Sequence, residues 1–164
     1  MKRTITGIAL LVSLLTGVGA GTPSASADPG LQSASGFGQV HLGLPFRNFA
    51  FSATKSADGT ASGNAQLENR ATGFRGHIAI DCLNVLGNTA VMSGVVISST
   101  SPNIPVGSDA FFAVQDNGEG PNAPPDEITS AYFFLGIPCT YVTDPAQLAL
   151  FFYTIETGEI QVSS

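Results

Sequence analysis

The chain has 164 residues, of which 12 are acidic and 6 basic, and its net charge is −6 with neutral histidines. A hydrophobic content of 43% argues against intrinsic disorder, and the negative charge argues against nucleic acid or anionic lipid as partners. Only 11% of the residues are charged, whereas small residues are abundant. This composition favours short strands joined by tight turns over long surface helices.

The first 27 residues have the three-part pattern of a cleavable secretory signal peptide. Lys2 and Arg3 precede an uncharged apolar run over residues 5–18, and the small-residue site Ala25-Ser26-Ala27 follows. The apolar run is short for a permanent membrane-spanning anchor, which is the alternative interpretation. We therefore expect cleavage before Asp28, a secreted product and no stable membrane anchor after cleavage.

The expected mature protein, residues 28–164, has the length of a single β domain. Subtracting 27 residues from 164 leaves 137, enough to bury about two-thirds of the surface of the unfolded chain. All 12 acidic residues but only 4 basic ones lie in this part, so its charge is 4 − 12 = −8. Its two cysteines, Cys82 and Cys139, are expected to form one disulfide in an oxidising compartment. A redox role is disfavoured because the pair lacks the C-x-x-C spacing.

Alternation of apolar and polar residues predicts strands in the first half of the chain. The clearest case is residues 60–68, where small or apolar residues alternate strictly with polar ones. Further strands are expected at residues 36–42, 47–55, 74–82 and 89–99, separated by turn signals such as Asp58-Gly59 and Gly87-Asn88. The short connections favour an all-β antiparallel meander that closes into a small β-barrel, with a two-layer β-sandwich as the alternative.

Three later segments, predicted as strands, each contain a Phe-Phe doublet: residues 110–114, 131–135 and 148–154. Neighbouring strand residues face opposite sides, so each doublet would place one ring on either side of the sheet. The rings expected to form an apolar surface or cavity are Phe111, Phe112, Phe133, Phe134, Phe151 and Phe152.

The second side of the sheet then needs a cover. A packed layer of the same chain is favoured over a partner subunit or an apolar ligand. Asp144 followed by Pro145 is a pattern that begins a short helix, which is one candidate for the cover. The chain is expected to end with a turn at Thr157-Gly158 and a strand at residues 159–163.

A polar, acidic and turn-rich loop spans residues 115–127. Asp116, Asn117, Glu119 and Asp126 offer the hard oxygen ligands that Ca²⁺ prefers, so a weak calcium site is one hypothesis. The spacing does not fit an EF-hand. The favoured alternative is a structural loop in which the Asp and Asn side chains bond to nearby backbone N–H groups.

Five short motifs follow one another in a recognisable order: residues 49–53, 58–63, 81–90, 116–120 with Pro125-Asp126, and 158–162. In this order the chain resembles a family of small secreted bacterial β domains of uncharacterised function. The resemblance implies an all-β fold and export, and it carries over no catalytic residue. The Phe-rich stretch after Cys139 departs from the family pattern.

Two classes of function remain open. The sequence contains no HExxH, G-x-S-x-G, P-loop or dinucleotide-binding motif, and its two histidines stand apart. We therefore favour a secreted non-catalytic module, which binds a ligand or a surface or associates with itself as a homo-oligomer, without a cofactor. The alternative is an extracellular enzyme or a calcium-dependent module that uses the loop of residues 116–127.

Overall fold

In the computed structural model, residues 31–41 and 46–164 are described. The expected signal peptide, residues 1–27, lies outside these residues. Nine strands and two 3₁₀ helices follow in chain order: β1 (Gln32–His41), β2 (Phe46–Lys55), β3 (Ala61–Asn69), β4 (Phe74–Leu86), β5 (Thr89–Ser99), β6 (Asp109–Gln115), β7 (Glu127–Thr129), β8 (Tyr132–Phe133), η1 (Cys139–Tyr141), η2 (Pro145–Leu148) and β9 (Phe152–Ser163). No helix in the described part of the chain has the length and apolar character needed to cross a membrane.

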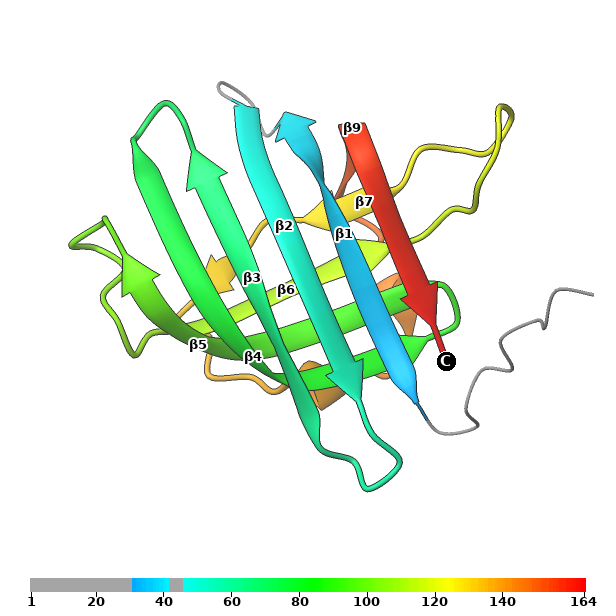
Figure 1. Cartoon of the computed structure of the whole chain (residues 1–164), viewed down its shortest axis with the longest axis horizontal. Coiled ribbons are helices and arrows are strands. Elements are labelled where there is room, and N and C mark those ends of the chain that lie inside the picture. The colour runs from blue at the N-terminus through cyan, green and yellow to red at the C-terminus, as the bar shows by residue number, and fades with distance from the viewer. Residues whose placement is uncertain (1–30, 42–45) are drawn as a thin grey trace, which may run out of the picture.

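Eight of the strands form a closed antiparallel β-barrel (Figure 1). Strands β1 to β6 are neighbours in chain order, β7 joins β6 to β9, and β9 pairs with β1 to close the ring. The short β8 lies outside the ring and pairs with the first part of β6. The all-β barrel predicted from the short connections is therefore confirmed, and the sandwich is not formed.

The alternating residues of the strands fill the interior of the barrel. On β2 the buried residues are Phe49, Phe51 and Ala53, the face expected from the sequence. The ring of Phe51 packs edge-on against that of Phe112 on β6, with ring centroids 5.9 Å apart. Residues of this core come from all eight strands of the ring, so the middle of the barrel is packed with side chains.

A second apolar cluster lies outside the ring, where the segment with η1 and η2 covers β5 and β6. Val91, Phe111 and Ala113 of these strands pack against Cys139, Val142 and Leu148 of the covering segment. As expected, Asp144 begins the short helix η2: its carboxylate accepts a 2.9 Å hydrogen bond from the backbone N–H of Ala146. The outward-facing side of β6 is thus covered by the chain itself.

Two strands expected around the later Phe doublets differ from the prediction, one by being shorter and one by beginning later. The strand expected at residues 131–135 is reduced to the two residues of β8, because Phe134 has a left-handed φ of 65° that turns the chain away from β6. Residues 148–151 are not extended either, since η2 ends at Leu148 and β9 begins only at Phe152.

The predicted turn at Thr157-Gly158 is wrong, because β9 continues through it to Ser163. The pairing of β1 with β9 shifts register between Gln39 and Val40, so that β9 holds an extra residue opposite β1. Gly158 has a φ of 108°, a conformation that side chains disfavour. The extra residue is Glu156, between Ile155 and Thr157, so this segment is a bulge inside a strand rather than a reversal of the chain.

Candidate functional site

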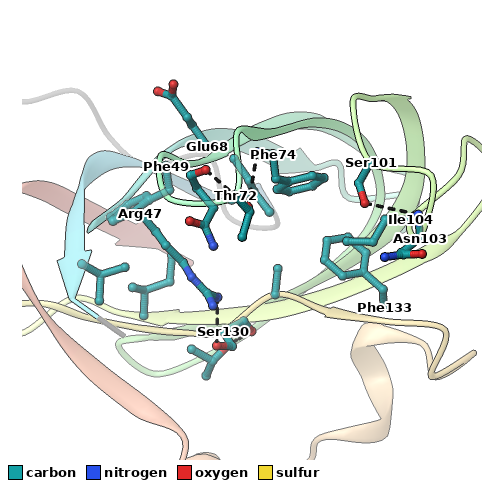
Figure 2. A pocket seen from close by; sticks show the side chains of 16 residues that line it. Arg47, Phe49, Glu68, Thr72, Phe74, Ser101, Asn103, Ile104, Ser130 and Phe133 are labelled. Carbon is teal, nitrogen blue, oxygen red and sulfur yellow. Dashed lines mark hydrogen bonds between the residues drawn. The ribbon is translucent and has the colours of Figure 1, made fainter. Parts of the chain in front are cut away.

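A cavity of about 420 Å³ lies at the end of the barrel where β1 and β3 end and β2 and β4 begin (Figure 2). Its volume falls in the range of about 300–1,000 Å³ that is usual for small-ligand pockets. Apolar side chains form most of the wall: Val40, Phe49, Leu67, Phe74, Ile104, Ile128, Ala131 and Phe133. The polar lining residues are Arg47, Glu68, Asn69, Thr72, Ser101, Asn103, Thr129 and Ser130.

Aromatic rings form the boundary between this cavity and the packed core. Phe49 lines the cavity and stacks on Phe51, with ring centroids 6.2 Å apart, and Phe51 belongs to the core. At the side of the cavity, Phe74 of β4 packs edge-on against Phe133 of β8, also at 6.2 Å. Because β8 leaves the ring, it brings Phe133 to the barrel end as an additional wall.

Arg47 is the cationic side chain that lines this cavity. It lies on β2, two residues before the core-facing Phe49, and Figure 2 shows it reaching across to Ser130. Its Nη1 donates a long hydrogen bond of 3.5 Å to Ser130 Oγ. Its Nε is buried without a hydrogen-bond partner, and among the described residues it forms no ion pair. The guanidinium is therefore poorly matched by acceptors.

Glu68, the carboxylate among the lining residues, is not the partner of Arg47. Its Oε2 accepts a 3.0 Å hydrogen bond from Asn48 Nδ2, and its Oε1 accepts from Arg75 Nε and Nη2 at 3.3 and 3.2 Å. The hydrogen bond from Asn48, followed by those from Arg75, lowers the pKa of Glu68 from its ordinary value. In Figure 2 its carboxylate points away from the cavity.

The acidic loop lies elsewhere, where it completes the edge of β9. Asp126, only 8% exposed, accepts hydrogen bonds of 2.8 Å from the backbone N–H groups of Asn117 and Ile160. Asp116 accepts in the same way from the N–H groups of Gly118 and Val162, at 2.8 and 3.0 Å. Ile160 and Val162 lie beyond the reach of the short β7, so the two carboxylates serve as the acceptors that a longer neighbouring strand would supply.

The four residues expected to bind calcium do gather, although hydrogen bonds already use most of their oxygens. Both oxygens of Asp116 and of Asp126 accept backbone N–H groups, and Asn117 Oδ1 accepts a 2.9 Å bond from Gln115 Nε2. Glu119 faces Glu159, whose negative charge raises the pKa of Glu119 from its ordinary value of 4.5. Within residues 31–41 and 46–164, no three His, Cys, Asp or Glu side chains form a group suited to a metal ion. Calcium binding stays a prediction.

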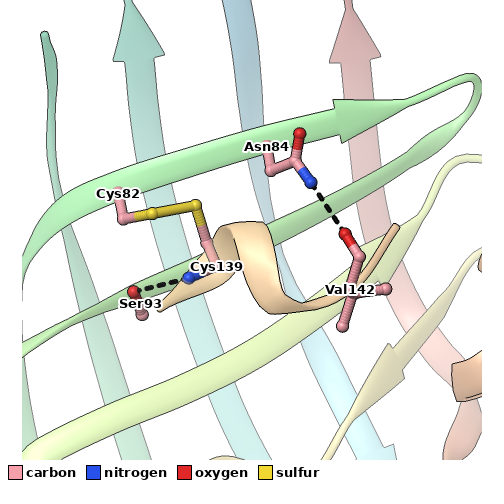
Figure 3. Close-up of a disulfide and its surroundings, with 5 residues drawn as sticks. All are labelled: Cys82, Asn84, Ser93, Cys139 and Val142. Carbon is pink, nitrogen blue, oxygen red and sulfur yellow. Dashed lines mark hydrogen bonds between the residues drawn. A yellow bond between two sulfur atoms is a disulfide. The ribbon is translucent and has the colours of Figure 1, made fainter. Parts of the chain in front are cut away.

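The predicted disulfide is confirmed and lies on the outer face of the barrel (Figure 3). Cys82 of β4 is bonded to Cys139 of η1, with Cα atoms 5.7 Å apart. Two hydrogen bonds hold the same segment, one from the backbone N–H of Cys139 to Ser93 Oγ at 3.1 Å and one from Asn84 Nδ2 to the carbonyl oxygen of Val142 at 3.0 Å. The disulfide therefore fastens the covering segment and does not line the cavity.

The rings of the Phe doublets are distributed over four environments. Phe112 lies in the barrel core, Phe111 and Phe152 lie in the outer cluster, and Phe133 lines the cavity. Phe134 and Phe151 are exposed, at 59% and 46%. The doublets thus contribute one ring to the cavity rather than forming it.

Reasoning from the sequence missed Arg47, although a signal was present. The expected strand of residues 47–55 has an inward face with Phe49, Phe51 and Ala53, and Arg47 has the same parity. An arginine on the apolar face of a strand needs an acceptor inside the fold or a ligand that supplies one.

Comparison of the chain with protein-family models, with curated protein sequences and with solved structures finds no significant match in any of the three.

Proposed function

We propose that the protein is a secreted, non-catalytic binding protein that holds a small, largely apolar ligand in the cavity at the end of its barrel. The cavity of about 420 Å³, with its aromatic and aliphatic wall, is the observation that carries this proposal. The proposal of export rests on the pattern of the first 27 residues.

The shape of the barrel supports a bound ligand rather than a solvent-filled end. An eight-stranded barrel has an interior that is either filled by its side chains or holds one small ligand. Here the core fills the middle, and Phe49 closes the inner end of the cavity. Each 100 Å² of apolar ligand surface that leaves water contributes roughly 2.5 kcal/mol to binding, before the entropic costs are subtracted.

The hydrogen bonds of the hydroxyl groups around the cavity support a binding protein rather than an enzyme. Thr129 Oγ1 accepts from the N–H of Ala113 and donates to the carbonyl of Ser130. Thr72 and Ser101 Oγ atoms accept from backbone N–H groups of their own turns. No histidine is among the described residues that line the cavity, and the carboxylate of Glu68 is bonded to Asn48 and Arg75, so none of these hydroxyls has a paired general base there.

A neutral dye that fluoresces in apolar surroundings, Nile red, tests this proposal with the purified protein. We expect its emission to rise on binding, and we expect Ala131→Trp to abolish the rise because the indole would occupy the cavity. Ala57→Trp is the matched control, since Ala57 is exposed in the turn at the opposite end of β2. Equal dye binding by the two variants, or no binding by the unmodified protein, would contradict the proposal.

Self-association is examined in the same samples. The exposed rings of Phe134 and Phe151 are candidates for a contact between copies. Sedimentation as a monomer, together with dye binding that depends on Ala131, supports the ligand function. A dimer whose dye binding is lost on dilution would instead place the apolar site between subunits and refute the proposed one.

A further inference from the structure

We propose that the ligand of this cavity carries a single carboxylate, which binds to the guanidinium of Arg47, while its apolar body lies against the aromatic wall. The inference rests on the proposed function and names the chemical class of its ligand.

The unsatisfied donors of Arg47 are the first argument. A guanidinium has five N–H donors, and among the described residues only Nη1 has a partner, Ser130 Oγ at 3.5 Å. Nε is buried without an acceptor. A buried donor without a partner costs free energy comparable to that of a lost hydrogen bond, and more when the group is charged. Nη2 also has no partner among the described residues and is not buried, so the outer end of the guanidinium is open to a ligand in the cavity.

The geometry of the donors favours a carboxylate. The two Nη groups form a planar fork that matches the two oxygens of a carboxylate, which gives two parallel hydrogen bonds. The other charged lining residue, Glu68, is acidic and is already bonded to Asn48 and Arg75. Among the described residues of the wall, Arg47 thus supplies one positive charge, which suits a monoanion better than a dianionic phosphate.

The position of Arg47 favours an amphipathic ligand. Its neighbour on the same face of β2 is Phe49, which pairs with Leu67 of β3, and Phe133 also lines the cavity. A carboxylate held at Arg47 therefore has an apolar wall beside it. A volume of 420 Å³ equals about 14 water molecules at ~30 Å³ each, which is room for a medium-chain carboxylic acid.

The overall negative charge of the protein makes a preference for an anionic ligand a strict test of the contact with Arg47. The mature chain carries 4 basic and 12 acidic residues, so at a distance it attracts cations and repels anions. A preference for an anionic ligand over a cationic one of equal length must then come from a local contact, because salt screens the distant charges within about 8–10 Å.

Isothermal titration at about pH 7 and 0.15 M salt, with three ligands of equal chain length, tests the inference. Decanoate carries the carboxylate, decanamide is neutral, and decylammonium is cationic. We expect decanoate to bind at least about tenfold more tightly than decanamide, as for a hydrogen bond to a charged group, and decylammonium to bind most weakly. Arg47→Met keeps the length of the side chain, and we expect it to reduce decanoate binding to the level of decanamide without weakening decanamide.

Further variants guard against a purely structural role of Arg47. Arg47→Lys keeps the charge without the fork, and we expect an intermediate affinity for decanoate. Ser130→Ala removes the internal partner of Arg47, and we expect it to retain the preference for decanoate. Circular dichroism verifies that each variant is folded. If Arg47→Met does not fold, the inference is tested by the affinity of Arg47→Lys for decanoate and by the relative affinities of the three ligands for the unmodified protein.

The outcomes separate the two proposals. If decanoate and decanamide bind equally well and dye binding still depends on the cavity, the inference of a carboxylate ligand is wrong, whereas the proposed binding function is retained. Tighter binding of decylammonium would overturn it as well. If none of the ligands binds and Nile red does not bind either, both proposals fail.

Discussion

Gly36 of β1 lies directly opposite Phe51 of β2, and the ring of Phe51 occupies the space that a side chain at Gly36 would need. A Cβ at Gly36 would stand 2.9 Å from Phe51 Cε1, 2.9 Å from Ile160 Cγ1 and 2.8 Å from the carbonyl oxygen of Glu159. The absence of a side chain here allows the aromatic core to pack against β1, at the seam where the barrel closes.

We expect Gly36→Ala to lower the free energy of unfolding by about 1–3 kcal/mol, because overpacking forces neighbouring atoms to shift. Urea denaturation followed by circular dichroism measures the effect. Ser35→Ala, at the exposed position before it, is the control and should change stability by less than about 0.5 kcal/mol. Adding Phe51→Leu to Gly36→Ala should cost less than the sum of the two single changes; strict additivity would show that the ring does not fill this space.

Asp126 gives the second prediction. Its two oxygens accept the backbone N–H groups of Asn117 and Ile160, and Asp126→Ala would leave both donors without a partner. We expect a loss of about 2–4 kcal/mol in the free energy of unfolding. Asp81→Ala, at an exposed position of β4, is the matched control and should be nearly neutral. A comparable small effect of both changes would mean that the acidic loop does not secure β9.

The raised pKa of Glu119 leads us to predict that the stability of the protein depends on pH. The charge of Glu159 raises the pKa of Glu119 above 4.5, so the folded state favours the protonated form. The stabilising contribution of this proton is complete below the pKa of the unfolded chain and disappears as the pH rises through the folded pKa. We therefore expect Glu119→Gln to raise the melting temperature at about pH 7 and to make little difference at about pH 3.

Salt provides the control for this electrostatic effect. In about 1 M NaCl the difference between Glu119→Gln and the unmodified protein should shrink at neutral pH, because the two carboxylates are screened. A difference that is independent of both salt and pH would show that the repulsion between Glu119 and Glu159 is not its cause.

The disulfide gives the fourth prediction. Replacing Cys82 and Cys139 by serine removes a cross-link between residues 57 apart, for which the chain-entropy model expects a loss of about 4 kcal/mol. The loss should appear first in the covering segment, where Leu150 is 94% exposed. Limited chymotrypsin digestion should cut the variant between residues 139 and 153 while the dye-binding cavity persists. Cleavage at the same rate with and without the disulfide would refute this role.

Local patterns predicted the strands best where both neighbours in the barrel are also neighbours in sequence. The strand expected at residues 89–99 coincides with β5, which lies between β4 and β6. The strand bounds predicted around the Phe doublets were wrong, because those strands pair with segments that are distant in sequence. The extent of β8 and the start of β9 depend on contacts with distant strands, and at Phe134 a backbone turn overrides the strand preference of a phenylalanine.

An apolar cavity was expected from the Phe doublets, but its position and most of its wall could not be predicted because the wall is assembled from distant parts of the chain. Arg47 and its partner Ser130 are 83 residues apart. Parity along β2 indicates that Arg47 faces inward, but not that β7 and β8 leave space in front of it. For the acidic loop, composition raised the possibility of a metal, whereas only the fold shows that Asp116 and Asp126 accept the free N–H groups of β9.

The pairing of the first described strand with the last has a kinetic consequence. One edge of β1 pairs with β2, and the other edge remains unpaired until β9, which ends at Ser163, has been added to the sheet. Contacts between segments so far apart in sequence slow the folding reaction, and until they form, the open edge of β1 is available to other chains. If the protein is exported, as we propose, the edge of β1 stays open until β9 has also left the cell and paired with it.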